Sequence, residues 1–385
     1  MDEIRQFQEV KRNADLESEK EKSGTLELDI GPPTPMNELQ EHFFMDLVYV
    51  WRFYIDDPLT WTFESPVFRV ITIAILRLAA WDFEVSLDGN ADLPVSFKSV
   101  PRWSCPVEDV YWFHGYLVVL QDEMDYEAML NSAVSKSRPY ISRQNARLII
   151  ISPWRIALVE LSQDTIKVSR RLVLLSNHSA MECSPGFRAL SRIFTRSELH
   201  MERWPINIPL EIVQMILYQL DPRDAVAFAQ ASSIANQCYY ASDPQFKGVS
   251  VQSFKSSIPC CGKRAGLENA TSCSKCYVWY HLDCIRPGDE HTSAACQKAS
   301  MALDPGGINR FSRRQTREGC QVRVRGSAKS LQVRLSKPSH QRPELRLLGN
   351  LVSVPPRLVQ YTILFNKTFA GLAYGLEDCI EQRLP

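Results

Sequence analysis

Six of the eleven cysteines in this 385-residue chain lie between residues 260 and 296, and this cluster restricts the local fold more than any other feature. Its centre, CSKCYVWYHLDC (273–284), has the spacing Cys273-x2-Cys276-x4-His281-x2-Cys284. Two thiolates at Cys-x2-Cys spacing can bind one Zn²⁺ through a tight turn, and a nearby His and Cys can add the remaining ligands. In a reducing compartment such a cluster favours metal over disulfides.

Charge and hydropathy place the chain inside the cell. The first 30 residues are charged and lack the apolar run of a signal peptide. The apolar stretch at 67–81 is interrupted by Arg69 and Arg77 and is shorter than the roughly 20 residues that a membrane span needs. We therefore expect a cytoplasmic or nuclear protein without a membrane segment. The 44 Lys and Arg residues balance 44 Asp and Glu residues, which disfavours a dedicated nucleic-acid protein.

The Cys/His cluster resembles a plant-homeodomain (PHD) finger, in which Cys-x-x-Cys, two aromatic residues, His and Cys follow in this order. The pair Cys260 and Cys261 lies where that family has its first ligands, but here the two are adjacent. After Cys296, Ala299 stands where a further Cys is expected. The resemblance implies metal ligands at Cys260, Cys261, Cys273, Cys276, His281, Cys284 and Cys296.

Because this pattern is incomplete, we expect about one structural zinc in a degenerate PHD-like segment at 258–300, with a metal-free segment as the alternative. A single zinc ion can be bound jointly by four ligands, Cys273, Cys276, His281 and Cys284. Trp279 matches a wall of the methyl-lysine cage of some PHD fingers, and such cages need several aromatic walls. Ile258-Pro259 supplies no opposite aromatic wall, which disfavours binding of a histone tail.

A second pattern, at 204–240, predicts three short helices. Pro209 suits the first turn of a helix, and Ile212, Met215 and Ile216 continue at helical spacing. Asp221-Pro222 ends this helix and begins a second one, and a third is expected near 233–241. About 45 residues cannot bury a large core, so we expect apolar surface that packs on a partner or on the neighbouring domain.

This helical pattern resembles the F-box, which reads Leu-Pro-x-Glu-Ile, then Ile-Leu, Leu and Asp. The matching residues are Ile208, Pro209, Glu211, Ile212, Ile216, Leu217, Leu220 and Asp224. Ile208 replaces the usual Leu, and no Trp closes the motif. The arrangement is similar to F-box proteins of filamentous fungi. The resemblance implies that these residues bind a Skp-type adaptor of a cullin ubiquitin ligase; an ordinary helical hairpin in the core is the alternative.

The rest of the chain reads as an α+β protein. We expect a disordered tail at 1–38, one mixed domain at 39–200, the F-box-like module at 204–250 and a basic, β-rich segment at 305–385. The mixed domain is predicted to hold buried helices at 43–55 and 66–83, a strand at 111–121, a helix after Asp122, a β-meander at 146–152, 155–161 and 165–175, and a helix at 186–197.

The basic segment shows strand alternation. Apolar residues alternate with polar ones from Val322 to Leu335, which predicts a hairpin around 326–328 with its arginines on the solvent face; an acidic or nucleic-acid partner is the alternative. A last strand is expected at 358–365, ending in a turn at Asn366-Lys367.

Three functions compete on this sequence. The leading one is a non-catalytic F-box-type adaptor that binds an unidentified protein substrate. The second is a zinc-finger protein that binds chromatin or nucleic acid through 258–347. The third is an enzyme with its site in 39–200, but that region contains no nucleophile elbow, phosphate-binding loop or HExxH motif. His114 lies among aromatic residues, where a packed histidine is the simpler interpretation. We therefore expect no enzymatic activity.

Overall fold

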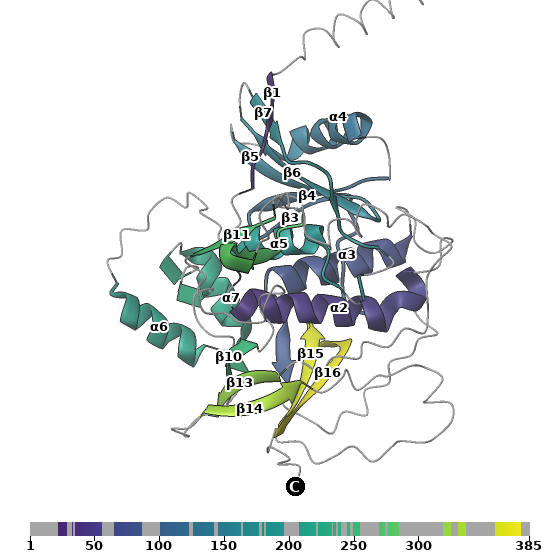
Figure 1. Ribbon diagram of the computed structural model, residues 1–385. Helices are drawn as coiled ribbons and strands as arrows, with labels where there is room; N and C mark the ends of the chain where they lie inside the picture. The colour runs from purple at the N-terminus through teal and green to yellow at the C-terminus, as the bar shows by residue number, and fades with distance from the viewer. Residues whose placement is uncertain are drawn as a thin grey trace, which may run out of the picture. The chain divides into compact units, whose positions relative to one another are not determined.

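The computed structural model divides the chain into two compact units (Figure 1). Unit 1 comprises 1–29 and 107–172, and unit 2 comprises 30–106 and 173–385. The residues that the structure describes are 22–28, 33, 35–55, 65–86, 101–122, 126–141, 145–162, 165–176, 179–180, 182–195, 208–220, 222–232, 234–235, 238–239, 245–246, 249–254, 269–273, 276–284, 319–324, 330–335 and 359–378.

The expected boundaries differ from this division. Of the region 39–200, residues 39–106 and 173–200 fall in unit 2, whereas 107–172, which include the meander and one helix, fall in unit 1. Within the expected tail at 1–38, strand β1 (Lys22–Thr25) pairs in parallel with a strand 143 positions later, and helix α2 already begins at Pro35. Charged composition concealed β1, because a strand at a sheet edge is held by main-chain hydrogen bonds and needs few apolar side chains.

Unit 1 is built on a seven-stranded mixed sheet in the order β1-β7-β6-β5-β4-β3, with β8 paired to β6. A helix, α4, connects the parallel strands β4 and β5. The expected meander is confirmed, since β5, β6 and β7 pair as antiparallel neighbours. The elements are β3 (Val110–Phe113), β4 (Tyr116–Leu120), α4 (Tyr126–Ser137), the short 3-10 turn η1 (Arg138–Tyr140), β5 (Ala146–Ile151), β6 (Arg155–Leu161), β7 (Thr165–Val168) and β8 (Leu172–Val173).

The single strand expected at 111–121 is instead a hairpin of β3 and β4. His114 and Gly115 both have positive φ, 47° and 79°, which is the backbone of a tight two-residue hairpin turn. The aromatic run around His114 hid this turn. The His114 ring packs 4.4 Å from that of Phe113, measured between centroids. On one face of the sheet, Met129 and Ala133 of α4 share a buried cluster with Leu148 and other strand residues.

Unit 2 contains three buried helices, α2 (Pro35–Ile55), α3 (Pro66–Ala79) and α5 (Pro185–Thr195), as the apolar patterns predict. Ser65 caps α3 by accepting a hydrogen bond from the Val67 amide at 3.2 Å. Ser184 does the same for Phe187 of α5 at 3.3 Å. Phe187 then stacks on Phe44 of α2, with ring centroids 4.2 Å apart.

A second seven-stranded sheet lies in unit 2, in the order β2-β15-β16-β14-β13-β10-β9. The predicted hairpin around 326–328 is confirmed by the antiparallel pairing of β13 and β14, whereas the side chains of its arginines lie outside the described residues. The strands are β2 (Glu84–Ser86), β9 (Gln245–Phe246), β10 (Val249–Phe254), β13 (Gly319–Val324), β14 (Ser330–Leu335), β15 (Val359–Phe365) and β16 (Thr368–Asp378).

The expected separate segment at 305–385 is therefore part of a larger sheet. Strand β15 pairs with β2 from the first quarter of the chain, and β13 pairs with β10. The turn between β15 and β16 is the predicted one, with Asn366 and Lys367 at φ 47° and 62°. The fold class is α+β, as expected. Among the described residues, no helix combines the length and apolar character that crossing a membrane requires.

Candidate functional site

Two features carry the candidate chemistry of unit 2, a helical module and a Cys/His hairpin. The module begins with α6 (Leu210–Gln219) and α7 (Pro222–Ala231). The described residues 234–235 and 238–239 of the expected third helix are helical. Pro209 precedes the first helical residue, and its carbonyl oxygen accepts the amide of Val213 at 3.2 Å. Pro209 is thus the N-cap residue of α6, one position before the first turn in which the sequence suggests that it lies.

The core of this module is small. Val213, Ala235 and Cys238 form its buried cluster, and Ile208, Leu217 and Phe228 pack against it. Two of the residues that the F-box resemblance assigns to partner binding, Ile208 and Leu217, therefore contribute to the module's own core. Helix α6 directs only one narrow side inward, because Val213 and Leu217 are one turn apart on the helix.

Most of the surface of α6 is exposed, and it carries large apolar side chains. Met215 is 64% exposed and Leu210 55%, and Ile212 and Tyr218 are also exposed. We call these four residues the α6 face. The one charged residue of α6 is Glu211, which is exposed in the first turn. Met215 and Tyr218 are three residues apart, so they are neighbours on the helix surface.

The α6 face matches the predicted binding residues only in part. Ile212 is exposed, whereas Ile216 and Leu220 are half-buried between the face and the module's core. Pro209 and Asp224 are exposed as well. Sequence reasoning did not select Leu210, Met215 and Tyr218 as binding residues. The sequence signal for this exposed side is the i, i+4, i+7 spacing of Glu211, Met215 and Tyr218. Periodicity alone does not tell which side of a helix packs against a core.

The Cys/His hairpin consists of β11 (Ala270–Ser272), β12 (Trp279–His281) and the 3-10 turn η3 (Leu282–Cys284). Its two strands are antiparallel, with Ser272 opposite Trp279. In the turn, the Cys273 amide donates to the Val278 carbonyl, and the Tyr277 amide donates to the Cys273 carbonyl, each at 2.8 Å. Tyr277 has a φ of 58°, in the left-handed region, which lets the chain reverse directly after Cys276.

The hairpin brings together part of the predicted zinc ligands. Cys273 and Cys276 share one turn, and each is 2% exposed. His281, at the end of β12, is also buried. The side chain of Cys284 and the residues Cys260, Cys261 and Cys296 lie outside the described residues. Within the described part of the chain, no group of three or more His, Cys, Asp or Glu side chains is arranged to hold a metal ion.

A Cys-x-x-Cys turn of buried thiols has the donor chemistry that one half of a tetrahedral zinc site requires. Cys273 and Cys276 fit that role, and a bound zinc would link the turn to the ligands that follow it. The zinc itself stays a prediction.

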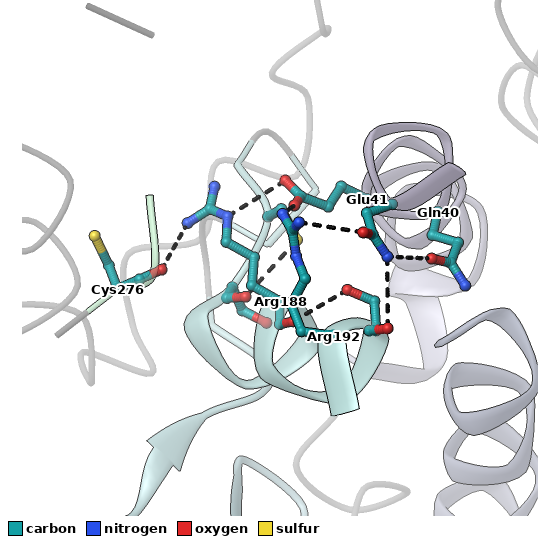
Figure 2. A network of polar contacts seen from close by, with 9 residues as sticks. Gln40, Glu41, Arg188, Arg192 and Cys276 are labelled. Atoms are coloured by element: carbon teal, nitrogen blue, oxygen red, sulfur yellow. Dashed lines mark hydrogen bonds and ion pairs between the residues drawn. The ribbon is translucent and has the colours of Figure 1, made fainter. Parts of the chain in front are cut away.

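A buried network of charged and polar groups lies beside this hairpin (Figure 2). The Glu41 carboxylate on α2 accepts from Arg188 Nε at 3.3 Å and from Arg192 Nη2 at 3.2 Å, each through a different oxygen. Arg192 also donates to Asn37 Oδ1 at 3.2 Å. Gln40 Nε2 donates to the carbonyls of residues 78 and 79 at the end of α3, at 3.0 and 2.7 Å. The network therefore joins α2, α3 and α5.

Burial perturbs the ionisation of this network. Burial alone lowers the pKa of a guanidinium, and the pKa of Arg192 is lowered despite nearby Glu41. For Arg188 the effect of burial is outweighed by the negative charge of Glu41, so its pKa is raised. Burial, with Glu41 adding to it, raises the pKa of the Cys183 thiol well above its ordinary value. Cys183 is therefore a neutral packing group and an unsuitable nucleophile near pH 7.

Comparison with models of protein families, with curated proteins and with solved structures finds no match. The resemblances to the F-box and to the PHD finger rest on the residues quoted above.

Proposed function

We propose that this protein is a non-catalytic F-box-type adaptor that docks on a Skp-type subunit of a cullin ubiquitin ligase through the α6 face. Other parts of the chain would hold a protein substrate. The observation that carries the proposal is the exposure of Leu210, Ile212, Met215 and Tyr218 on a helix whose sequence resembles the F-box.

Size and exposure support docking over a role as a core hairpin. A hairpin in the core would have its large apolar side chains covered, whereas Met215 is about two-thirds exposed. An amphipathic helix that lays such side chains into a partner's groove is a recurrent mode of recognition. Helix α6 carries Glu211 and no basic residue, which is unlike a surface that binds phosphate or nucleic acid.

The test is binding of the purified full chain to a purified Skp-type adaptor. Replacing Met215 and Tyr218 by Ala removes two exposed anchors, and each well-buried anchor contributes about 1–3 kcal/mol of binding free energy. The dissociation constant should therefore rise at least about tenfold. The thermal melting temperature should stay near that of the wild type, because neither side chain packs in the module's core.

Two further variants serve as controls. Glu127 on α4 of unit 1 is exposed, and Glu127→Ala should leave adaptor binding unchanged. Val213 is 3% exposed, and Val213→Ala should lower the melting temperature. Absence of binding by the wild-type chain would refute the proposal. A loss of binding that follows melting temperature across all these variants would show that α6 acts as part of the core.

A further inference from the structure

Helix α5 carries two buried arginines one turn apart, and among the described residues Arg188 alone bonds to the Cys/His hairpin. Arg188 and Arg192 each bond to Glu41. Arg188 Nη1 also donates to the main-chain carbonyl oxygen of Cys276 at 3.3 Å, across 88 positions of sequence. Figure 2 shows Arg188 extended from α5 toward that carbonyl, with the Glu41 carboxylate beside the same guanidinium.

The hairpin is short, and its own strands contribute little stability. Its strands β11 and β12 are three residues long each, and an isolated two-stranded hairpin of this size is marginally stable in water. Its buried cluster consists of Cys273, Cys276 and Val278. The two hydrogen bonds within the turn use the amides of Cys273 and Tyr277 and the carbonyls of Cys273 and Val278. The Cys276 carbonyl is thus bonded from outside the hairpin, by a charged donor.

A hydrogen bond from a guanidinium to a buried carbonyl is stronger than one between neutral groups. Glu41 holds the Arg188 side chain in place, and α2 and α3 hold Glu41 and its neighbour Gln40 in turn. Arg188 therefore connects the hairpin to the helical core through a side chain that is itself held by its partners.

We propose that Arg188 is a positioning residue that holds the Cys273–Cys276 turn on α5 without metal, so that the two thiols are placed before any zinc binds. Zinc would then bind to a turn that is already formed, so metal binding would not have to drive the folding of this segment. The proposal is independent of adaptor binding by the α6 face.

The test measures how fast N-ethylmaleimide modifies each cysteine of the full, metal-stripped chain, read by mass spectrometry of its peptides. Arg188→Met and Arg192→Met are matched variants, because each removes a buried cation bonded to Glu41. We expect Arg188→Met to raise the rates at Cys273 and Cys276 about 10- to 100-fold relative to Cys183, since the turn opens locally. Arg192→Met should leave that ratio unchanged.

Cys183 is the internal reference because it is buried in the same helical core beside both arginines. If Arg188→Met raises all three rates equally, the variant loosens the whole core and the proposal is wrong. The same holds if both variants change the ratio alike, or if neither changes it.

A second measurement uses Co²⁺ as a probe of the site, through its thiolate charge-transfer absorption. If the turn is preformed by Arg188, Arg188→Met should weaken Co²⁺ binding about 10- to 100-fold, as loss of an outer-shell partner does, and Arg192→Met should not. Equal Co²⁺ affinity of wild type and Arg188→Met would overturn the proposal. A wild-type chain that binds no Co²⁺ would refute the zinc prediction, while the alkylation ratio would still decide the role of Arg188.

Discussion

The indole Nε1 of Trp51 on α2 donates a hydrogen bond to the carbonyl oxygen of Ala370 on β16 at 3.0 Å, across 319 positions of sequence. The Trp51 ring meets Trp103 edge-on, with centroids 5.4 Å apart, and Trp103 meets Phe365 of β15 at 5.2 Å. Trp103 Nε1 in turn donates to the Val70 carbonyl of α3 at 2.8 Å. The C-terminal hairpin β15–β16 is therefore part of the helical core of unit 2.

Trp51→Phe should lower the free energy of unfolding by about 1–3 kcal/mol. The substitution keeps an aromatic ring but leaves the buried Ala370 carbonyl without this donor. Urea denaturation followed by circular dichroism measures the change. Trp112→Phe is the matched control in unit 1: Trp112 is 53% exposed, so its loss should cost less than about 0.5 kcal/mol. Equal costs for the two variants would contradict the role given to the Trp51 bond.

Gly371→Ala should weaken the same contact between α2 and β16 by a change on β16. Gly371 has a φ of +86°, and an added Cβ would lie 3.0 Å from Val50 Cγ1 and 3.2 Å from Trp51 Nε1. We expect a loss of about 1–3 kcal/mol from backbone strain alone. At Gly24, φ is ordinary and a Cβ would meet Lys167 Cγ at 3.5 Å. Gly24→Ala should therefore change the denaturation midpoint little, and a similar loss at both glycines would refute the argument.

Glu41→Gln should lower the free energy of unfolding by about 3–5 kcal/mol, because it leaves two buried guanidinium groups without their shared carboxylate. The pair Arg147–Glu160, whose side chains are 34% and 39% exposed and whose N and O are 3.3 Å apart, is the more solvent-accessible control. Glu160→Gln should cost less than about 1 kcal/mol. Urea denaturation of the two variants distinguishes them, and a cost below about 1 kcal/mol for Glu41→Gln would show that the buried network does not stabilise the fold.

Stability should fall at alkaline pH through Cys183. Burial raises the pKa of this thiol, so the folded protein keeps it neutral, whereas the unfolded chain ionises it near pH 8.5. The stabilisation from the raised pKa is complete below that pH and is lost as pH rises above it. The stability difference between wild type and Cys183→Ala should therefore shrink from pH 8 to pH 10. A difference that is constant over this range would show that Cys183 titrates normally.

The full chain should contain about one equivalent of zinc when purified without chelators. Cys276→Ser combined with His281→Ala removes two predicted ligands and should reduce the zinc content to near zero, as measured by elemental analysis. Zinc that is absent from the wild type, or that persists in the double variant, would rule out this site. A Cys105→Ser variant is the control, because that cysteine lies outside the cluster.

Local sequence patterns determined much of the secondary structure. The apolar runs at 43–55 and 66–83 produce α2 and α3, the alternating segments from 146 to 175 produce the meander, and Asn366-Lys367 produces the last turn. These features follow from periodicity and turn chemistry, which act over a few residues. His114-Gly115 shows the limit of that reasoning, since an aromatic run concealed a turn that two left-handed residues form.

Only the tertiary structure decided how these elements combine. Two contacts, the pairing of β2 with β15 and the bond from Arg188 to Cys276, join residues that are far apart in sequence. The fold also divides the region 39–200 between two units. The sequence by itself determined that α6 is amphipathic and that Cys273 and Cys276 share a turn. The fold decided that Val213 faces inward while Met215 is exposed, and that a buried arginine holds the cysteine turn. The reason is physical: periodicity defines the sides of a helix or strand, whereas burial depends on partners that only folding brings together.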